Sequence, residues 1–335
     1  MKRLRAGVIG LGVGAAHAAA YRADARCELA ALCDLDPAKL EAAEAEHPGV
    51  RVAREAGELI ADPELDVISV ASYDDHHFEQ VRAALERGKH VFVEKPICQS
   101  EEEARTLHRL LAERPELRLS SNLPLRRSPR FVELKRQVDE GRFGRLFYVE
   151  GDYDYGRLWK ITEGWRGEVE NYSVVLGGAV HIVDLLLWIT GDEPMRVSAS
   201  GNRIATEGTT FAYNDLVVAL VEFESGLIGK FSANFGCVHP HYHGIKLFGR
   251  DATFVNGVPE GRLFERREDG VAARPVTSAY PGVGKGDLIE SFVDSIVSDR
   301  PAAVTPEQVF QTMALCLAID RAVAEGRPVT PTRFG

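Results

Sequence analysis

The stretch Gly7-Val8-Ile9-Gly10-Leu11-Gly12-Val13-Gly14-Ala15-Ala16-His17 decides the fold of this chain. The apolar residues 4–9 indicate a buried strand, three glycines spaced two apart follow, and the alanine-rich continuation favours a helix. A strand, a tight turn and a helix in this order are typical of a pyrophosphate-binding loop, because glycine lacks a Cβ and the first N–H groups of the helix face the anion. The spacing Gly-x-Gly-x-Gly departs by one position from the usual Gly-x-Gly-x-x-Gly.

An acidic residue follows the next strand. The apolar residues 27–33 end at Asp34, twenty positions after Gly14, where a carboxylate accepts hydrogen bonds from an adenosine ribose. Asp34 and Asp36 would repel a 2′-phosphate and no arginine follows Asp34 immediately, so the sequence favours NAD over NADP. The alternative is a glycine-rich turn without a ligand. The cofactor-binding residues predicted in this part are Gly10, Gly12, Val13, Gly14 and Asp34.

Strands and helices alternate as far as Asn122. The predicted strands are residues 4–9, 28–33, 50–53, 67–71, 90–93 and 118–121, and the predicted helices are 17–21, 37–46, 56–61, 78–87 and 100–113. This alternation with short connections predicts an α/β fold with a parallel sheet covered on both faces and its site at the strand ends. We expect residues 1–122 to form a dinucleotide-binding domain of the Rossmann type.

The pattern changes after Asn122. A helix at 129–140, a strand at 143–155 and a helix at 179–189 precede six β-like runs, at 196–205, 215–224, 227–235, 244–248, 252–255 and 262–265. Two amphipathic helices end the chain, at 285–298 and 306–326. Residues 123–335 are therefore expected to form an α+β domain with one open, mainly antiparallel sheet of five or six strands.

Composition excludes several classes of function. The chain has 335 residues, 45% hydrophobic and 27% charged, as in an ordinary globular protein, and its net charge of −10 disfavours nucleic acid and anionic membranes as partners. The five cysteines are scattered, which suits a reducing cytoplasm. Met1-Lys2-Arg3 before apolar residues resembles a signal peptide, but cleavage would remove the first strand, and no apolar run is long enough to span a membrane. We expect a cytoplasmic protein.

A further specific stretch is Gly88-Lys89-His90-Val91-Phe92-Val93-Glu94-Lys95-Pro96. A strand that looks buried ends here in a lysine, at the edge of the sheet where the cofactor is expected. An isolated lysine at a strand end is usually a solvated surface residue. Its combination with the glycine loop and Asp34 favours a place in the site.

Taken together, these motifs resemble the glucose-fructose oxidoreductase and inositol dehydrogenase family, Gfo/Idh/MocA, along nearly the whole chain. The stretches that carry the resemblance are the glycine loop, Asp34, 72–77, 88–96, 141–144, Trp165-Arg166, 177–184 and 325–329. The resemblance implies an NAD(P)-linked oxidoreductase acting on a sugar or cyclitol hydroxyl. It also implies a homodimer or homotetramer assembled through the sheet of the second domain.

The resemblance assigns the catalytic lysine to Lys95 and the active-site histidine to His181. Oxidation of a secondary alcohol needs a base near the hydroxyl, and a desolvated lysine or a histidine can serve. Many members carry an aspartate four residues before this histidine, where this chain has Gly177. Tyr153 and Tyr155 are candidate compensating groups, whereas strand alternation puts Asp154 on the opposite face. The identity of the base therefore stays open between Lys95 and His181.

The remaining site predictions fall into two sets. The cofactor side adds Ser72, Asp74, His77, Glu94, Lys95 and Pro96, from the loops after the fourth and fifth strands. The substrate side comprises polar and aromatic residues suited to a polyhydroxylated ligand, although each could be an ordinary surface residue and Asp184 is read as mainly structural. They are Asn122, Arg126, Tyr153, Tyr155, Lys160, Trp165, Arg166, Asp184 and His239.

Cys237, His239, His241 and His243 have the residue types of a zinc site. Pro240 breaks the strand and alternating neighbours crowd one ion, so we expect no metal and assign the histidines to the rim of the substrate pocket. The sequence thus predicts an NAD-dependent dehydrogenase that oxidises a secondary hydroxyl of a sugar, sugar derivative or cyclitol. The alternatives are a reductase of a keto-sugar or sugar-nucleotide, a non-catalytic sensor on the same scaffold, and an enzyme that recycles a tightly bound nicotinamide.

Overall fold

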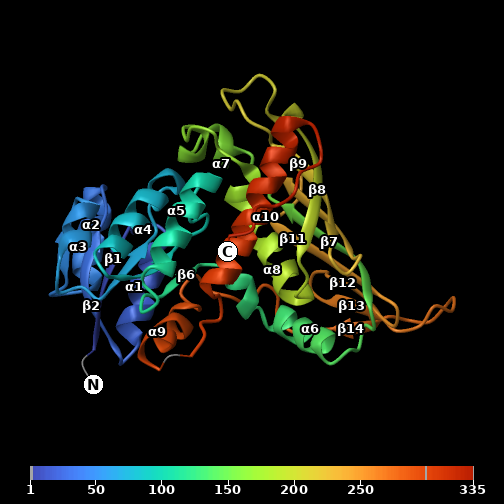
Figure 1. Ribbon diagram of the computed structural model, residues 1–335, viewed down its shortest axis with the longest axis horizontal. Coiled ribbons are helices and arrows are strands. Elements are labelled where there is room, and N and C mark those ends of the chain that lie inside the picture. Colours follow the sequence, from blue (N-terminus) through green and yellow to red (C-terminus); the bar gives the residue numbers. More distant parts are fainter. Residues whose placement is uncertain (1–2, 299, 335) are drawn as a thin grey trace. The chain divides into compact units, whose positions relative to one another are not determined.

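The computed structural model describes residues 3–298 and 300–334 (Figure 1). Met1 and Lys2, which open the stretch that resembles a signal peptide, lie outside the described residues. The chain divides into two compact units. The first contains residues 3–124, Gly284–Phe310 and Phe334, and the second contains Leu125–Val283 and Gln311–Arg333.

The first unit is built on a parallel sheet in the order β3-β2-β1-β4-β5-β6. Its strands are β1 (Leu4–Ile9), β2 (Cys27–Cys33), β3 (Arg51–Ala53), β4 (Val67–Val70), β5 (His90–Val93) and β6 (Leu119–Ser121). Its helices are α1 (Gly14–Ala23), α2 (Pro37–Glu46), α3 (Ala56–Ala61), α4 (His77–Glu86), α5 (Glu101–Ala112) and α9 (Ile289–Val297). The connections run outward from β1 in one direction and from β4 in the other, as in a doubly wound sheet. The Rossmann prediction is confirmed.

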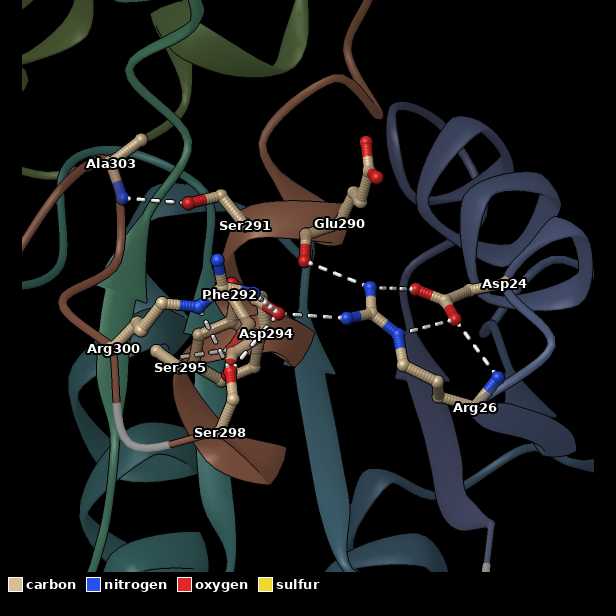
Figure 2. Close-up of polar contacts among 10 residues, drawn as sticks. All are labelled: Asp24, Arg26, Glu290, Ser291, Phe292, Asp294, Ser295, Ser298, Arg300 and Ala303. Atoms are coloured by element: carbon tan, nitrogen blue, oxygen red, sulfur yellow. Dashed lines mark hydrogen bonds and ion pairs between the residues drawn. The ribbon is translucent and has the colours of Figure 1, made fainter.

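The helix α9 packs with the first unit, although the sequence analysis places every residue after Asn122 in the second domain. Figure 2 shows the contacts that attach it: the Arg26 guanidinium, which also pairs with Asp24, donates to Asp294 at 3.0 Å and to the Glu290 carbonyl at 3.3 Å. The ring of Phe292 lies 5.5 Å from that of Phe92 on β5. Because these partners are far apart in sequence, no local pattern signals their pairing.

The second unit contains an eight-stranded sheet in the order β14-β13-β12-β11-β7-β10-β9-β8. Its strands are β7 (Leu146–Asp154), β8 (Pro194–Asn202), β9 (Leu216–Phe223), β10 (Ile228–Asn234), β11 (Tyr242–Gly249), β12 (Thr253–Val255), β13 (Gly261–Phe264) and β14 (Arg274–Val276). All neighbours are antiparallel except β7 and β10. The mainly antiparallel sheet is confirmed, but the expected count of five or six strands is wrong. The three-residue β14 contains Pro275 and has too little alternation to be recognised.

Helices cover one face of this second sheet. They include α6 (Pro129–Asp139), α8 (Val180–Thr190) and most of α10 (Pro306–Glu325), and α7 (Trp159–Thr162) is a single turn. The helix α8 lies directly on β7, where a Cβ on Gly151 would come within 2.8 Å of Leu186. A close approach of helix and strand thus requires glycine at this point. No helix in the described part of the chain is long and apolar enough to cross a membrane.

Candidate active site

The three glycines after β1 have three different surroundings. Gly10 has a φ of +87°, and a Cβ there would overlap the carbonyl oxygen of Ala71. A Cβ on Gly14 would meet Val8 at 3.0 Å and Ala71 at 3.1 Å, whereas one on Gly12 would meet nothing within 4 Å. Gly10 therefore makes the turn, Gly14 lets α1 approach the sheet, and Gly12 leaves room for a ligand.

The N-terminus of α1 has no side-chain cap and no acidic residue in its first turn, which favours binding of an anion. Its N-cap residue, Val13, supplies no side-chain hydrogen bond. In contrast, the start of α5 is capped by Ser100 and Glu103. The first N–H groups of α1 thus have no side-chain acceptor and carry the positive end of the helix dipole, so the loop fits the pyrophosphate of a dinucleotide.

Asp34 lies at the end of β2 and connects two loops. Its Oδ2 accepts a hydrogen bond from the Leu11 N–H at 2.6 Å, and its Oδ1 accepts one from the Asp36 N–H at 2.9 Å. The Lys39 ammonium is 3.5 Å from Oδ2. The carboxylate therefore holds the glycine loop as well as standing where a ribose is expected, and its ribose role stays a prediction.

The loops after β4 and β5 are connected by His77. Its buried imidazole places Nδ1 2.6 Å from the Pro96 carbonyl oxygen and Nε2 3.1 Å from the Ser72 carbonyl oxygen. The Ser72 hydroxyl donates to Gln80 at 2.8 Å, and Asp74 begins a short 3₁₀ turn. His77 thus holds in place the loop that carries Lys95. The predicted cofactor contacts of Ser72, Asp74 and His77 stay predictions.

Glu94 and Lys95 are both buried at the carboxyl end of β5. Burial acts to raise the pKa of Glu94, but the His17 hydrogen bond and the charges of His17, Lys285 and Lys95 outweigh it and lower the pKa to about 2. The Asn122 amide donates to Glu94 Oε1 at 2.5 Å and to the Lys285 carbonyl at 2.9 Å. Asn122 was predicted to bind substrate, and its full burial among these partners favours a supporting role.

The sequence analysis did not single out His17. This imidazole is fully buried, with Nδ1 2.9 Å from the Ser69 hydroxyl and Nε2 3.4 Å from Glu94 Oε1. A histidine at the third position after Gly14, on the inward side of an alanine-rich helix, was the signal that could have identified it.

In the second unit, His181 begins α8 after an unusual turn. Residues Val175–Ala179 form a π-helix, a feature frequent at functional sites, and His181 follows at the second position of α8. The ring of His181 is buried and stacked 6.3 Å from that of Tyr153. A Cβ on Gly178 would come within 2.5 Å of the Tyr153 ring, so glycine is required for this approach.

Gly177 stands where the resemblance noted in the sequence leads us to expect an aspartate. A Cβ at this position would overlap the hydroxyl of Tyr172, which is buried beside the turn. Tyr172 therefore occupies the space that an aspartate at position 177 needs. A steric conflict with Tyr172 is therefore our explanation for the departure noted in the sequence.

Aromatic and imidazole rings gather around Tyr153, the ring on which His181 stacks. The aromatic–imidazole cluster consists of Tyr153, Tyr155, His181, His241 and His243. Within it the ring centres of His241 and His243 are 4.7 Å apart, and His241 is 5.0 Å from Tyr153 and 4.9 Å from Tyr155. Burial raises the pKa of the Tyr153 hydroxyl, which therefore remains protonated as a hydrogen-bond donor.

The other substrate-side predictions have varied surroundings. Arg126 donates to both carboxylate oxygens of Asp184, at 2.9 and 2.6 Å, and both side chains are buried. Lys160 and Arg166 lie over the rings of Trp159 and Trp165, at 4.1 and 4.4 Å. The two hydrogen bonds between Arg126 and Asp184 join the start of the second unit to helix α8.

His239 is exposed and contacts Tyr242, 5.7 Å away between ring centres, whereas His241 and His243 belong to the cluster. The three histidines are alternate residues, so strand parity alone does not distinguish them, and His239 lies before the start of β11 at Tyr242. Among residues 3–298 and 300–334, no group of three or more His, Cys, Asp and Glu side chains has an arrangement that could hold a metal ion.

Comparison with known families decides the affiliation. Residues 4–122 match the model described as "Oxidoreductase family, NAD-binding Rossmann fold", and residues 131–255 match the GFO/IDH/MocA C-terminal domain. The chain belongs to the Gfo/Idh/MocA family. It is an oxidoreductase with an NAD-binding Rossmann domain, and its relatives include proteins named for sugar and cyclitol substrates.

Curated Gfo/Idh/MocA proteins resemble the chain over most of its length. It is 28% identical to a 1,5-anhydro-D-fructose reductase of Ensifer adhaerens over 81% of each chain. It is 26% identical to a myo-inositol 2-dehydrogenase of Thermotoga maritima over 97% of this chain and 98% of that protein.

Solved structures of the family share the fold. A levoglucosan dehydrogenase in complex with NADH matches at a TM-score of 0.87 and 20% identity, over 99% of this chain and all of that one. A scyllo-inositol dehydrogenase of Lactobacillus casei with bound NAD(H) and scyllo-inositol matches at 0.81 and 22% identity, over 98% and 99%.

Proposed function

We propose that this Gfo/Idh/MocA protein is an NAD-dependent dehydrogenase that oxidises a secondary hydroxyl of a sugar, sugar derivative or cyclitol. The observation that carries the proposal lies in the first unit. The glycine loop, the His77 loop and Lys95 follow the adjacent strands β1, β4 and β5 at their carboxyl ends. In a doubly wound sheet this edge, where the strand order reverses, binds the ligand.

The proposed chemistry assigns roles to two side chains. NAD, when bound, accepts the hydride that leaves the substrate carbon. Lys95 hydrogen-bonds the reacting hydroxyl and takes its proton, and His181 is the second side chain that we assign to proton transfer. The hydroxyl of Tyr153 supplies a donor for a polyhydroxylated ligand. The resemblance to the family and the burial of both Lys95 and His181 support these roles.

The preference for NAD rests on two carboxylates. Asp34 and Asp36 lie together after β2, and Asp34 accepts the Asp36 N–H at 2.9 Å. A 2′-phosphate at this point would face negative charge, whereas ribose hydroxyls would find acceptors. The five cysteines are all free, which supports a cytoplasmic location.

A second candidate is the reverse reaction. A relative that matches 81% of the chain is named a reductase of 1,5-anhydro-D-fructose, so reduction of a keto-sugar remains the alternative direction. Both directions use the same proton-transfer groups.

The first experiment measures NADH absorbance for wild type and Lys95→Ala with NAD and then NADP, across inositols, aldoses, uronates and anhydrosugars. We expect turnover in the wild type to fall at least about a hundredfold in the variant while NAD binding is nearly intact, as for loss of a proton-transfer group. Undiminished turnover in Lys95→Ala contradicts the role of the lysine. Wild-type protein that binds NAD but oxidises no member of the panel favours the reductase or a sensor.

A further inference from the structure

A buried polar cluster in the first unit contains Glu94, the residue that precedes Lys95 in the chain. The Glu94 cluster consists of Glu94, His17 and Asn122, whose side chains are all buried. Glu94 Oε1 accepts from the Asn122 amide at 2.5 Å and lies 3.4 Å from His17 Nε2, and the Asn122 amide is also 3.1 Å from that nitrogen. One carboxylate oxygen therefore meets two polar partners inside the protein.

The cluster connects the parts of the first unit that form the cofactor edge. His17 is on α1, in the turn that follows the glycine loop, and Glu94 precedes Lys95. Asn122 follows β6 and donates to the Lys285 carbonyl at 2.9 Å. The position of Glu94 is therefore set from three directions, which fixes where its charge lies relative to the lysine next to it.

The charges that face Glu94 come from each of these elements. They are those of His17 on α1, Lys95 on the same loop and Lys285 before α9, and each lowers the pKa of Glu94 against the effect of burial. A carboxyl with a pKa of about 2 is ionised over the whole range in which a lysine titrates. By reciprocity, an ion that its neighbouring lysine stabilises also stabilises the ammonium form of that lysine.

We propose that Glu94 is a positioning residue that acts through Lys95: its buried carboxylate, held by His17 and Asn122, sets the pH above which Lys95 loses its proton. In the proposed dehydrogenase this is the pH above which Lys95 can accept the proton of the substrate hydroxyl. The mechanistic consequence rests on the proposed function, but the charge coupling between Glu94 and Lys95 does not.

The test measures the protonation of Lys95 directly. Wild type, Glu94→Gln and Glu94→Asp are labelled with an amine-selective anhydride between pH 6 and 11, and modification of Lys95 is followed by mass spectrometry. Because glutamine keeps the shape and removes the charge, the Lys95 midpoint should move to lower pH by at least about one unit in Glu94→Gln and stay close to wild type in Glu94→Asp. Coincident curves for wild type and a folded Glu94→Gln overturn the proposal.

Asp24→Asn is the matched control. Asp24 is an ionised, largely buried carboxylate paired with Arg26, and its pKa is lowered by that hydrogen bond. It precedes β2, at the amino edge of the sheet, whereas Lys95 follows β5 at the carboxyl edge. This variant also loses a charge pair but should leave the Lys95 curve unchanged. A shift equal to that of Glu94→Gln would show that lost stability, and not local charge, moves the midpoint.

Lys285→Glu keeps the proposal testable if Glu94→Gln does not fold. The Lys285 side chain is exposed and only its backbone carbonyl holds Asn122, so the substitution leaves the contacts of the cluster in place. Reversing a charge that faces Glu94 should move the Lys95 midpoint to higher pH, less so in high salt because the site of the change is exposed. No movement at low salt contradicts the coupling.

The pH profile of kcat/KM connects the result to catalysis. If Lys95 is the base, the acid limb of the profile should move in Glu94→Gln in the same direction as the labelling midpoint. A labelling shift without turnover of any substrate leaves the coupling established and counts against the proposed function alone. A labelling shift with an unmoved acid limb shows that Lys95 is not the group whose ionisation limits the rate.

Discussion

At the residue scale, Asp34 has one role that the structure shows and a second one that we predict. Its carboxylate already accepts the N–H groups of Leu11 and Asp36, and it stands at the end of β2 where the ribose of a dinucleotide is expected. Removing it affects both the shape of the glycine loop and the charge that faces a 2′-phosphate.

Asp34→Ala should therefore weaken NAD binding and improve NADP relative to NAD. Titration of the variant with each dinucleotide, followed by intrinsic fluorescence, measures the ratio of the two dissociation constants. We expect this ratio to shift toward NADP by at least about tenfold, which corresponds to one lost hydrogen bond to the ribose and one removed repulsion. An unchanged ratio would mean that another residue reads the ribose.

Gly177 is a second residue whose surroundings can be tested, because the hydroxyl of Tyr172 fills the space that a side chain at position 177 would need. Gly177→Ala should destabilise the protein by about 1–3 kcal/mol through overpacking. In a Tyr172→Ala background, which opens that space, the same substitution should cost much less. A double-mutant cycle in urea measures the difference. Equal costs in both backgrounds would contradict the steric explanation for the missing aspartate.

At the scale of elements, helix α10 contributes Asp320, whose partly exposed side chain contacts Ser173 just before the π-helix. Burial raises the pKa of Asp320 to about 7, while a hydrogen bond from Ser173 acts in the opposite direction. The Ser173 hydroxyl also accepts the N–H groups of Val175 and Leu176, each at 3.1 Å. Asp320 is thus connected to the turn that leads to His181.

The pH dependence of stability follows from this shift. Because the folded-state pKa of Asp320 lies above its unfolded value of 3.8, folding takes up a proton and the free energy of unfolding falls as pH rises from about 4 to about 7. Asp320→Asn should remove this decline, so that the variant gains on wild type across that interval by at most about 4 kcal/mol. Urea unfolding of both proteins at pH 4, 6 and 8 measures the gain. A constant difference at all three pH values contradicts the assignment.

At the scale of the whole molecule, the face of the second sheet that carries Leu220 retains large apolar side chains. Val218, Leu220 and Ile228 are 38–53% exposed, and Tyr148 stacks on Phe248 at 5.4 Å. Ion pairs such as Lys230–Asp152, at 2.5 Å, lie among them. A mixed apolar and paired-charge face of this kind is typical of a protein interface.

We therefore expect a homodimer or homotetramer formed through this face, as the family resemblance implies. Leu220→Asp should reduce the assembly to a smaller species in analytical ultracentrifugation, because it buries a new charge at the interface. Val271→Asp, which changes an exposed side chain in the loop between β13 and β14, is the matched control and should leave the assembly intact. A wild-type monomer at micromolar concentration contradicts the expectation.

Much of the fold could be predicted because its signals are local. The alternation of apolar runs with helical periods located each strand of the first sheet and most of the second, and glycine spacing located the dinucleotide loop. Contacts between distant segments could not be predicted, because no local pattern encodes them. An example is the packing of α9 on the first unit through Arg26 and Phe92. For the same reason the sequence did not identify His17 as a partner of Glu94.

The sequence by itself determined the family, the class of each sheet and the chemistry-bearing motifs, because each of these follows from the order and spacing of neighbouring residues. Only the tertiary structure decided which side chains share surroundings. In the folded protein His241 and His243 contact Tyr153, Arg126 forms an ion pair with Asp184, and Asn122 is buried beside Glu94. These choices depend on packing between segments that are distant in the chain, where burial and the demand for hydrogen-bond partners select one arrangement.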